Sequence, residues 1–476
     1  MEKRVIFNNL IWRFAERCGA QFVKLIVELV LARLLLPDDY GTISLVTVII
    51  IILNVFVDSG LGNALIQKVD ADEEDFSTAF YFNIVWCIVI YIALFAASPL
   101  IAHFYNKSEL TVIIRVLGIT ILISGVKNVQ QAYVSRKMLF KKFFFATLGG
   151  TIGAAFVGIG MAYMGYGVWA LVFQQLFNTL VDTVILWMTV KWRPVRAFSI
   201  KKLKILFSFG WKLLASGLID TIYTNIRALV IGKLYLPESL AYYNQGEKFP
   251  NLVVSNINNS IDSVLLPAMS REQDDRIRVK NMTRNSIKVS TYIMAPLMIG
   301  IAVAADSIVC ILLTDKWLPC VFFLRIFCIT YMFQPIHTAN LNAIKALGRS
   351  DLFLKLEVYK NCVGIVLLLS TMFISVKALA YSSLVSAVTS QLINSGPNKK
   401  LLGYGYAEQL KDIFPNICIA LIMGVIIYPI TYMQINIFLK LLIQIILGIM
   451  IYIIESVILK IDSFYYIKNL LYRKNN

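Results

Sequence analysis

Charged side chains are scarce in this sequence. Asp, Glu, Lys and Arg make up 15% of its 476 residues, while 58% of the residues are hydrophobic. Soluble domains contain about 25% charged residues, so the composition excludes an ordinary soluble protein. Long apolar runs instead predict an all-α polytopic membrane protein.

Residues for metal or thiol chemistry are also few. The chain has two histidines, His103 and His337, which lie far apart in the sequence. Its seven cysteines form no Cys-x-x-Cys pair and lie mostly inside apolar runs, as small core residues do. We therefore expect no metal site, no disulfide framework and no cofactor.

Motifs of nucleotide and acyl chemistry are missing as well. No Walker motif, dinucleotide fingerprint or nucleophile elbow occurs. Asp70-Ala-Asp72 matches the Asp-x-Asp pattern of many glycosyltransferases, but no catalytic domain surrounds it. These absences argue against an enzyme, and a membrane glycosyltransferase or polysaccharide polymerase stays as an alternative.

Apolar stretches long enough to cross a bilayer recur along the whole chain. We predict about fourteen membrane-spanning helices, at residues 10–36, 41–66, 78–104, 110–134, 143–164, 167–190, 207–235, 250–268, 286–313, 320–344, 354–374, 376–394, 413–433 and 437–459.

Basic side chains account for a net charge of +17 and gather in alternate loops. This pattern is typical of cytoplasmic loops, so we expect no nucleic-acid partner. It places both termini in the cytoplasm. The largest clusters are Arg136, Lys137, Lys141 and Lys142; Lys191, Arg193, Arg196, Lys201, Lys202 and Lys204; and Arg271, Arg276, Arg278, Lys280 and Arg284.

Short segments repeat after about 200 residues, which indicates two related six-helix lobes. We predict an N-terminal lobe at 1–191, a cytoplasmic amphipathic linker at 192–206, a C-terminal lobe at 207–396, and two further helices with a cytoplasmic tail at 397–476. The aligned residues are Trp12 and Trp211, Arg13 and Lys212, Arg33 and Lys233, Pro37 and Pro237, Asp58 and Asp262, and Arg115 and Arg325.

The first predicted helix carries a charged stripe. At about 100° per residue, Arg13, Arg17, Lys24 and Glu28 fall on one side of it. Each charge near mid-bilayer costs roughly 2.5–3.5 kcal/mol on insertion scales, so the stripe should face protein or a water-filled cavity. The alternative is that the two arginines snorkel to the interface and that Lys24 and Glu28 form an i,i+4 pair.

The seventh predicted helix repeats this pattern with Lys212, Asp220 and Arg227. Facing stripes on the two equivalent helices would form a net-positive lining for an anionic substrate. The candidate substrate-binding residues are Arg13, Arg17, Lys24, Lys212 and Arg227. The alternative is a set of buried ion pairs, for example Glu28 with Arg227, that holds the lobes together.

Other charges inside the predicted spans leave two roles open. Asp58 and Asp262, like Glu28 and Asp220, are candidates for ion coupling or pairing, although both precede sequences that favour a cap or helix break. Arg115, Lys127 and Arg325 could either pair locally or line the cavity. Asp182 and Glu357 are candidates for proton transfer.

Several longer segments resemble one family, the bacterial polysaccharide and O-antigen exporters. These are Wzx-type and teichuronic-acid-type flippases of the MOP (multidrug/oligosaccharidyl-lipid/polysaccharide) superfamily. The resemblance covers nearly the whole chain. It is carried by LARLLLPDDYG (31–41), DSGLGNALIQ (58–67), GYGVWALVFQQL (165–176), LAYYNQGEKFPNLV (240–253), VLLPAMSREQDD (264–275) and ALGRSDLFLK (346–355).

The resemblance implies a MATE-like fold in the bacterial cytoplasmic membrane. It also implies that the chain moves a polyprenyl-diphosphate-linked oligosaccharide from the inner to the outer leaflet by alternating access, for O-antigen, capsule, exopolysaccharide or teichuronic acid. The expected partners are this substrate, membrane lipid, a coupling ion (proton or sodium) and polysaccharide assembly proteins. A multidrug or cation exporter of the same fold is the remaining alternative, although its cavity should be acidic.

Overall fold

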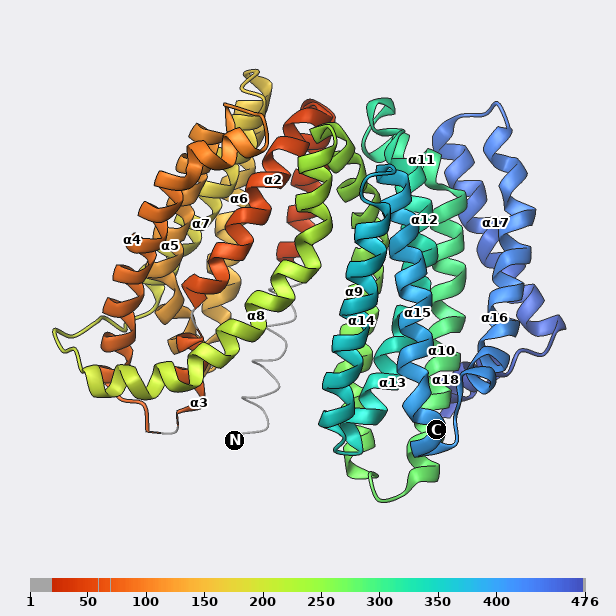
Figure 1. The fold of residues 1–476 in the computed structure, drawn as a ribbon. Helices are drawn as coiled ribbons and strands as arrows, with labels where there is room; N and C mark the ends of the chain where they lie inside the picture. Colours follow the sequence, from red (N-terminus) through yellow and green to blue (C-terminus); the bar gives the residue numbers. More distant parts are fainter. Residues whose placement is uncertain (1–18, 59, 69, 474–476) are drawn as a thin grey trace. The chain divides into compact units, whose positions relative to one another are not determined.

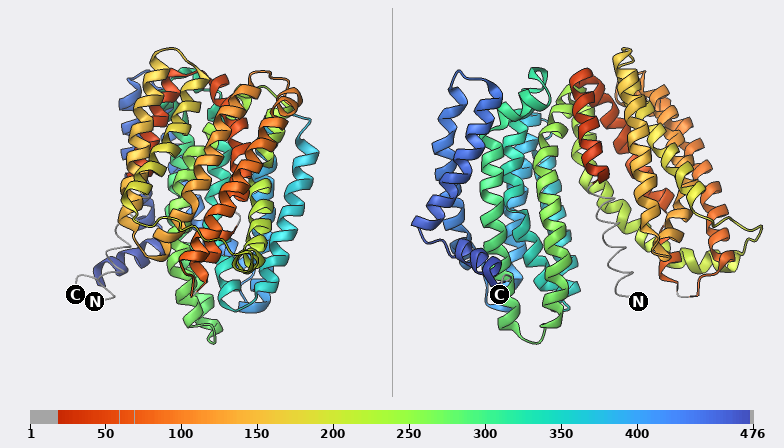
Figure 2. Two further views of the ribbon diagram at one scale, coloured as in Figure 1. Left: turned by 90° about the vertical axis from the view of Figure 1, so that its left-hand side faces the viewer. Right: turned by 180° about the vertical axis from the view of Figure 1, so that it is seen from behind.

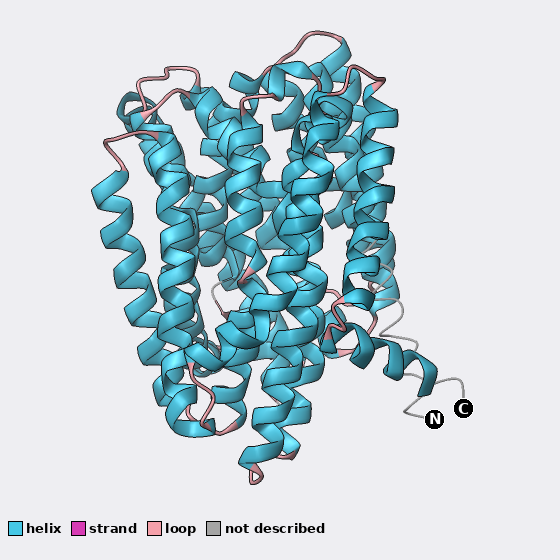
Figure 3. Cartoon of the chain, turned by 90° about the vertical axis from the view of Figure 1, so that its right-hand side faces the viewer, coloured by secondary structure: helices cyan, strands magenta, loops and turns pink. Residues whose placement is uncertain are grey.

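The computed structural model describes residues 19–58, 60–68 and 70–473, which fold into helices without a strand (Figure 3). Contacts divide the chain into two compact units, Met1–Ala241 and Tyr242–Asn476. We call them the N-terminal unit and the C-terminal unit and describe each separately.

A helix over residues 19–34 comes first among the described residues. The helices that follow (Figure 1) are α2 (Pro37–Asp58), α3 (Leu61–Gln67), α4 (Glu73–Phe104), α5 (Leu110–Arg136), α6 (Phe140–Tyr163), α7 (Val168–Thr189), α8 (Ile200–Leu234), α9 (Pro237–Arg271), α10 (Arg276–Val303), α11 (Ala305–Leu312), α12 (Cys320–Met332), α13 (Gln334–Ala346), α14 (Ser350–Thr371), α15 (Val376–Leu402), α16 (Tyr406–Ile427), α17 (Ile437–Ile458) and α18 (Asp462–Arg473).

The predicted all-α membrane architecture is confirmed. Each of the fourteen predicted spans coincides with a helix or with two consecutive helices, as far as the residues are described. Within the described part of the chain, ten spans are long and apolar enough to cross a membrane. Helices α9, α14 and α15 miss that criterion because they carry more polar and charged residues.

The predicted linker at 192–206 covers a non-helical segment and the first residues of α8. Residues 192–199 are non-helical, and α8 begins at Ile200 and continues without interruption to Leu234. Figure 1 shows that the first turns of α8 run across the end of the N-terminal unit before the helix turns to follow α2. The second part of the predicted linker is therefore continuous with α8, and its place along the membrane surface stays a prediction.

The helix boundaries agree with the sequence repeat around Pro37 and Pro237. In both places a helix ends, two non-helical residues follow, and the proline begins the next helix. Proline suits this first position because its missing N–H would have no partner there. A Cβ on Gly41 would lie 1.9 Å from the Pro237 carbonyl oxygen, so the two turns pack at the same end of the N-terminal unit.

Glycines allow α2, α3 and α8 to pack closely in the N-terminal unit. Gly60, between α2 and α3, has φ +68°, and a Cβ there would lie 2.2 Å from the carbonyl oxygen of Gly210 on α8. Further along, a Cβ on Gly232 of α8 would lie 2.0 Å from the Leu45 side chain. Side chains at these glycines would push α8 away from α2 and α3.

Three glycine-to-alanine variants separate the effect of a positive φ on stability from the effect of a clash with α8. Gly160→Ala, in an open part of α6, should be neutral or stabilising by up to about 1 kcal/mol. Gly165→Ala, at φ +80° with open space around it, should cost about 1–2 kcal/mol. Gly60→Ala combines positive φ with a backbone clash and should lower the thermal midpoint in detergent most. Equal midpoints for Gly165→Ala and Gly60→Ala would contradict the close approach of α8.

A buried network of amide side chains links three helices of the C-terminal unit. The Asn340 amide donates to Gln409 Oε1 at 2.9 Å, and the Gln409 amide donates back to Asn340 Oδ1 at 2.9 Å. Asn398 Nδ2 also donates to Asn340 Oδ1, at 2.7 Å. Interhelical hydrogen bonds of this kind stabilise helix packing in membranes, and here they attach α16 to α13 and α15. Helix α16 also pairs with α17 at one side of this unit (Figures 1 and 2).

Candidate functional site

The first charged stripe is described only in part, because Arg13 and Arg17 lie outside the described residues. Lys24 lies on the helix at 19–34, and its side chain is 69% exposed. Its Nζ is 4.0 Å from Glu28 Oε1, at the outer limit of an ion pair. The expected i,i+4 pair is thus formed loosely, and the ammonium group remains available to a ligand.

The second stripe lies on α8. Lys212 and Asp220 are exposed, and Arg227 is half-buried. Nearby polar side chains are satisfied within the helix: Thr224 donates to the Asp220 carbonyl at 2.9 Å, and Asn225 donates to the Thr221 carbonyl at 2.9 Å.

Arg227 differs from these neighbours in its hydrogen bonding. Its Nε is buried and has no hydrogen-bond partner among the described residues. A buried guanidinium N–H without a partner is costly. An anionic ligand would satisfy it once the side chains that cover the Nε move. Arg227 is therefore the best-supported candidate in the predicted lining.

The two aspartates expected at helix breaks differ. Asp58 is the last residue of α2, and Asn128 Nδ2 donates to its Oδ1 at 2.7 Å. Asp262 is exposed in the interior of α9, which continues past it and through Pro267 to Arg271. The expected break is present at Asp58 and absent at Asp262, because the second copy lacks the Gly60 that ends the helix in the first.

Other charges inside the helices pair locally. Lys127 on α5 lies 3.0 Å from Asp182 on α7, and both side chains are 16% exposed. A lysine and a carboxylate in such a pair neutralise each other in the membrane. The remaining pairs are Arg325 with Asp306, Lys360 with Glu357, and Arg115 with Ser98 and the Phe95 ring.

Of the two roles left open for Lys127, Arg325 and Arg115, the structure therefore favours local contacts. Lys212 and Arg227 differ from them: among the described residues, neither has an ion-pair partner at a carboxylate. The lack of a carboxylate partner distinguishes these two candidate lining residues from the charges that pair between helices.

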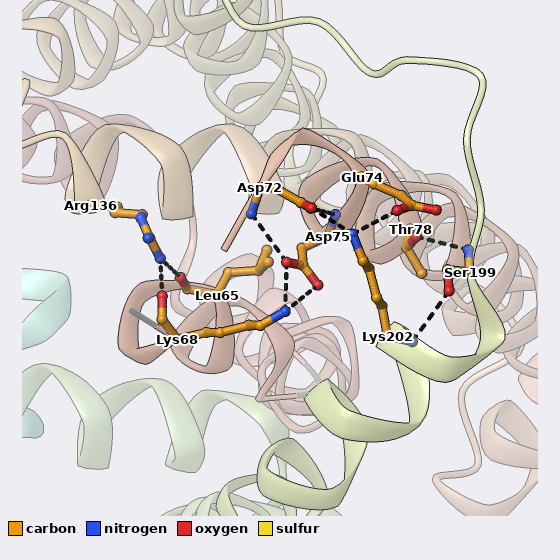
Figure 4. A network of polar contacts seen from close by, with 9 residues as sticks. All are labelled: Leu65, Lys68, Asp72, Glu74, Asp75, Thr78, Arg136, Ser199 and Lys202. Atoms are coloured by element: carbon orange, nitrogen blue, oxygen red, sulfur yellow. Dashed lines mark hydrogen bonds and ion pairs between the residues drawn. The ribbon is translucent and has the colours of Figure 1, made fainter. Parts of the chain in front are cut away.

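A polar network at the end of the N-terminal unit explains the acidic loop before α4 (Figure 4). Asp72 and Asp75 form a capping box at the start of α4. Lys68 Nζ binds both carboxylate oxygens of the fully buried Asp75, at 2.8 and 2.7 Å. Lys202 Nζ lies 2.6 Å from both Asp72 and Glu74 and so attaches the start of α8 to α4.

This network accounts for the Asp-x-Asp match. The Asp72 carboxylate caps a helix and binds Lys202, and these contacts lower its pKa to about 2. Both contacts occupy the carboxylate that the glycosyltransferase interpretation would assign to a metal–nucleotide. Sequence reasoning missed the network, although Asp72 followed three residues later by Asp75 resembles the pattern of a capping box.

Comparison with known proteins gives the family. The family model described as "Polysaccharide biosynthesis protein" matches residues 30–322. The chain is 28% identical over 306 residues to the teichuronic acid biosynthesis protein TuaB of Bacillus subtilis (strain 168), which covers 63% of this chain and 62% of TuaB. It is 21% identical over 315 residues to the succinoglycan biosynthesis transport protein ExoT of Rhizobium meliloti (strain 1021), covering 66% of this chain and 64% of ExoT. The chain therefore matches somewhat less than two thirds of the length of these two relatives.

Solved structures give the fold. The lipid II flippase MurJ, in an inward closed conformation, superposes with a TM-score of 0.78 at 16% identity over 97% of this chain and 100% of MurJ. An inward-facing multidrug resistance MATE family transporter of the MOP superfamily superposes with a TM-score of 0.61 at 14% identity, over 82% of this chain and 98% of that one. The fold is thus the MurJ- and MATE-like fold. The resemblance to polysaccharide exporters is confirmed by the family model. Because the family model matches more than half of the sequence, this chain belongs to the polysaccharide biosynthesis protein family.

Proposed function

We propose that this protein is a flippase that moves polyprenyl-diphosphate-linked oligosaccharides from the inner to the outer leaflet of the bacterial cytoplasmic membrane. The family, the MurJ-like fold and the cationic stripes support this proposal. The single observation that carries it is the half-buried Arg227, whose Nε has no partner among the described residues of a membrane-crossing helix.

The chemistry of the substrate explains why such a lining is needed. The hydroxyl groups of a sugar chain lose their hydrogen bonds to water in hydrocarbon, at a cost of several kcal/mol each. A diphosphate adds charges that require cationic partners. Arg227 can offer a planar fork to phosphate oxygens, and Lys24 and Lys212 can offer point charges. The lipid tail can stay in the bilayer while the head crosses.

Transport by alternating access then requires the lobes to rock around the bound head group. We assign the two sequence repeats to 1–191 and 207–396, with residues 192–206 between them and 397–476 outside the repeat. Helix α8, which begins the second repeat, packs on α2 and α3 within the N-terminal unit. Both termini lie in the cytoplasm in this scheme, as the basic loops indicate. The Lys202 contacts with Asp72 and Glu74 would keep the start of α8 fixed to the first lobe during the cycle.

A proton or sodium gradient is the proposed driving force. The candidate coupling carboxylates are Glu28, Asp58, Asp220 and Asp262. Asp58 is the best placed among them, because it ends α2 beside Asn128 and is exposed. Membrane lipid and polysaccharide assembly proteins are the other proposed partners.

Deletion of the gene tests the function. We expect lipid-linked repeat units with complete sugars to accumulate in the inner leaflet, where an impermeant glycosidase added from outside cannot reach them. Complementation with the intact chain should restore surface glycan. Repeat units with missing sugars would instead support a glycosyltransferase, and complete units accumulating in the outer leaflet would support a polymerase. Either result would contradict the flippase proposal.

A further inference from the structure

A polar pocket of about 460 Å³ lies in the C-terminal unit, where α10, α16 and the turn between α17 and α18 meet. None of its lining residues belongs to the predicted substrate lining, which the flippase proposal places on the helix at 19–34 and on α8. Its charged lining residues are Arg284, Lys288, Glu408, Lys411, Asp412, Lys460 and Asp462.

One acidic side chain in the pocket is fully engaged. Asp412 is 4% exposed and accepts two hydrogen bonds from Arg284, both at 2.7 Å. The Tyr404 hydroxyl donates to the same carboxylate at 2.9 Å. Burial beside this carboxylate raises the pKa of Tyr404, so the hydroxyl stays a donor. Asp412 therefore holds Arg284 in place and leaves no free negative charge in the pocket.

The other two acidic side chains also have cationic partners. Asp462 lies 3.2 Å from Lys288, and Glu408 lies 3.4 Å from Lys280. Lys288 also lies 3.5 Å from Asp412. Each carboxylate in the lining thus has at least one basic partner.

Two lysines in the lining remain. Lys411 and Lys460 are exposed, and neither lies within ion-pair distance of a carboxylate among the residues that the structure describes. Lys460 is held at φ +49° in the turn that follows α17. The lining therefore has four basic and three acidic side chains, and the positive charge that is not engaged by a carboxylate lies on Lys411 and Lys460.

The position of the pocket along the membrane-crossing helices indicates which anion could reach it. It lies at the first turns of α16 and just beyond the last turn of α17, both of which are long and apolar enough to cross a membrane. Lipid headgroups lie at this level. Helix α18 follows directly and runs at an angle to the other helices of the C-terminal unit (Figure 2). Its aromatic residues Phe464, Tyr465 and Tyr466 are typical of an interfacial helix.

We propose that this pocket binds the phosphate of an anionic membrane phospholipid, with Lys411 and Lys460 as its ligands. Basic pockets between membrane helices bind such headgroups. The paired Arg284 and Lys288 shape the pocket, and α18 lies against the membrane surface beside it. Bound lipid would link α16 to the α17–α18 turn.

Lipid binding by the full-length purified chain tests this proposal. Native mass spectrometry should show phosphatidylglycerol bound in preference to phosphatidylcholine. The Lys411→Gln, Lys460→Gln variant should bind phosphatidylglycerol about thirtyfold more weakly. Each basic side chain near the membrane surface contributes about fivefold to the affinity, and the two contributions multiply. The matched control is Lys137→Gln, Lys355→Gln, which removes two exposed charges outside the pocket.

The control should bind phosphatidylglycerol as the parent does, and all variants should keep the parent's thermal midpoint in phosphatidylcholine. An equal loss in the control would show a general surface-charge effect and overturn the proposal. Displacement of phosphatidylglycerol by an equal concentration of inorganic phosphate would also overturn it, because the site would then be one for free phosphate.

Discussion

Replacing Lys68 with methionine should destabilise the N-terminal unit by about 3 kcal/mol, near the lower end of the range for breaking a buried ion pair. Asp75 is fully buried, and Lys68 binds both of its carboxylate oxygens. Without Lys68 the carboxylate would keep the backbone N–H of Asp72 as a donor but would lose its compensating charge. The thermal midpoint of the purified protein in detergent should fall accordingly.

Two further variants isolate the cause. Lys202→Met breaks ion pairs in the same network with the partly exposed Asp72 and Glu74, and should cost only about 0–1 kcal/mol. The Lys68→Met, Asp75→Asn double variant removes the buried charge and should recover most of the loss. Equal effects of Lys68→Met and Lys202→Met would show that burial of Asp75 does not determine the stability of this end of the unit.

The positions of the helices were predictable because each span is a long apolar run. A membrane requires such runs wherever the backbone crosses it. The Pro37 and Pro237 turns were predictable for a similar reason, since proline fixes the start of a helix locally.

Contacts between helices were not predictable from one sequence. The pairing of Lys127 with Asp182 joins α5 to α7, and periodicity along a single helix carries no information about its neighbour. Asp58 and Asp262 look equivalent in the repeat, yet α2 breaks after the first and α9 continues past the second. The glycine at position 60 decides this difference, because it supplies the positive φ.

The predicted substrate lining stays a prediction, and the structure describes the surroundings of its residues on α8. The stripe positions on α8 are accessible or only half-buried, and Arg227 has an unpartnered Nε among the described residues. The facing of the two stripes stays a prediction.

Export by Arg227 variants tests the central proposal most directly. If Arg227 binds the diphosphate, Arg227→Gln should reach the membrane at parental abundance and abolish glycan export. Arg227→Lys should keep part of the activity, because a point charge still attracts phosphate but lacks the bidentate fork. Lys201→Gln, near the start of the same helix, is the matched control and should export normally.

The deciding measurement is glycan export and membrane abundance of the Glu28→Gln, Arg227→Gln double variant. The flippase account predicts an abundant protein without export, since the ligand for the diphosphate is still missing. If Glu28 and Arg227 instead form a structural ion pair, each single variant leaves an uncompensated buried charge at a cost of about 3–5 kcal/mol. Removing both would then restore abundance and export together, and that recovery would contradict a substrate-binding role for Arg227.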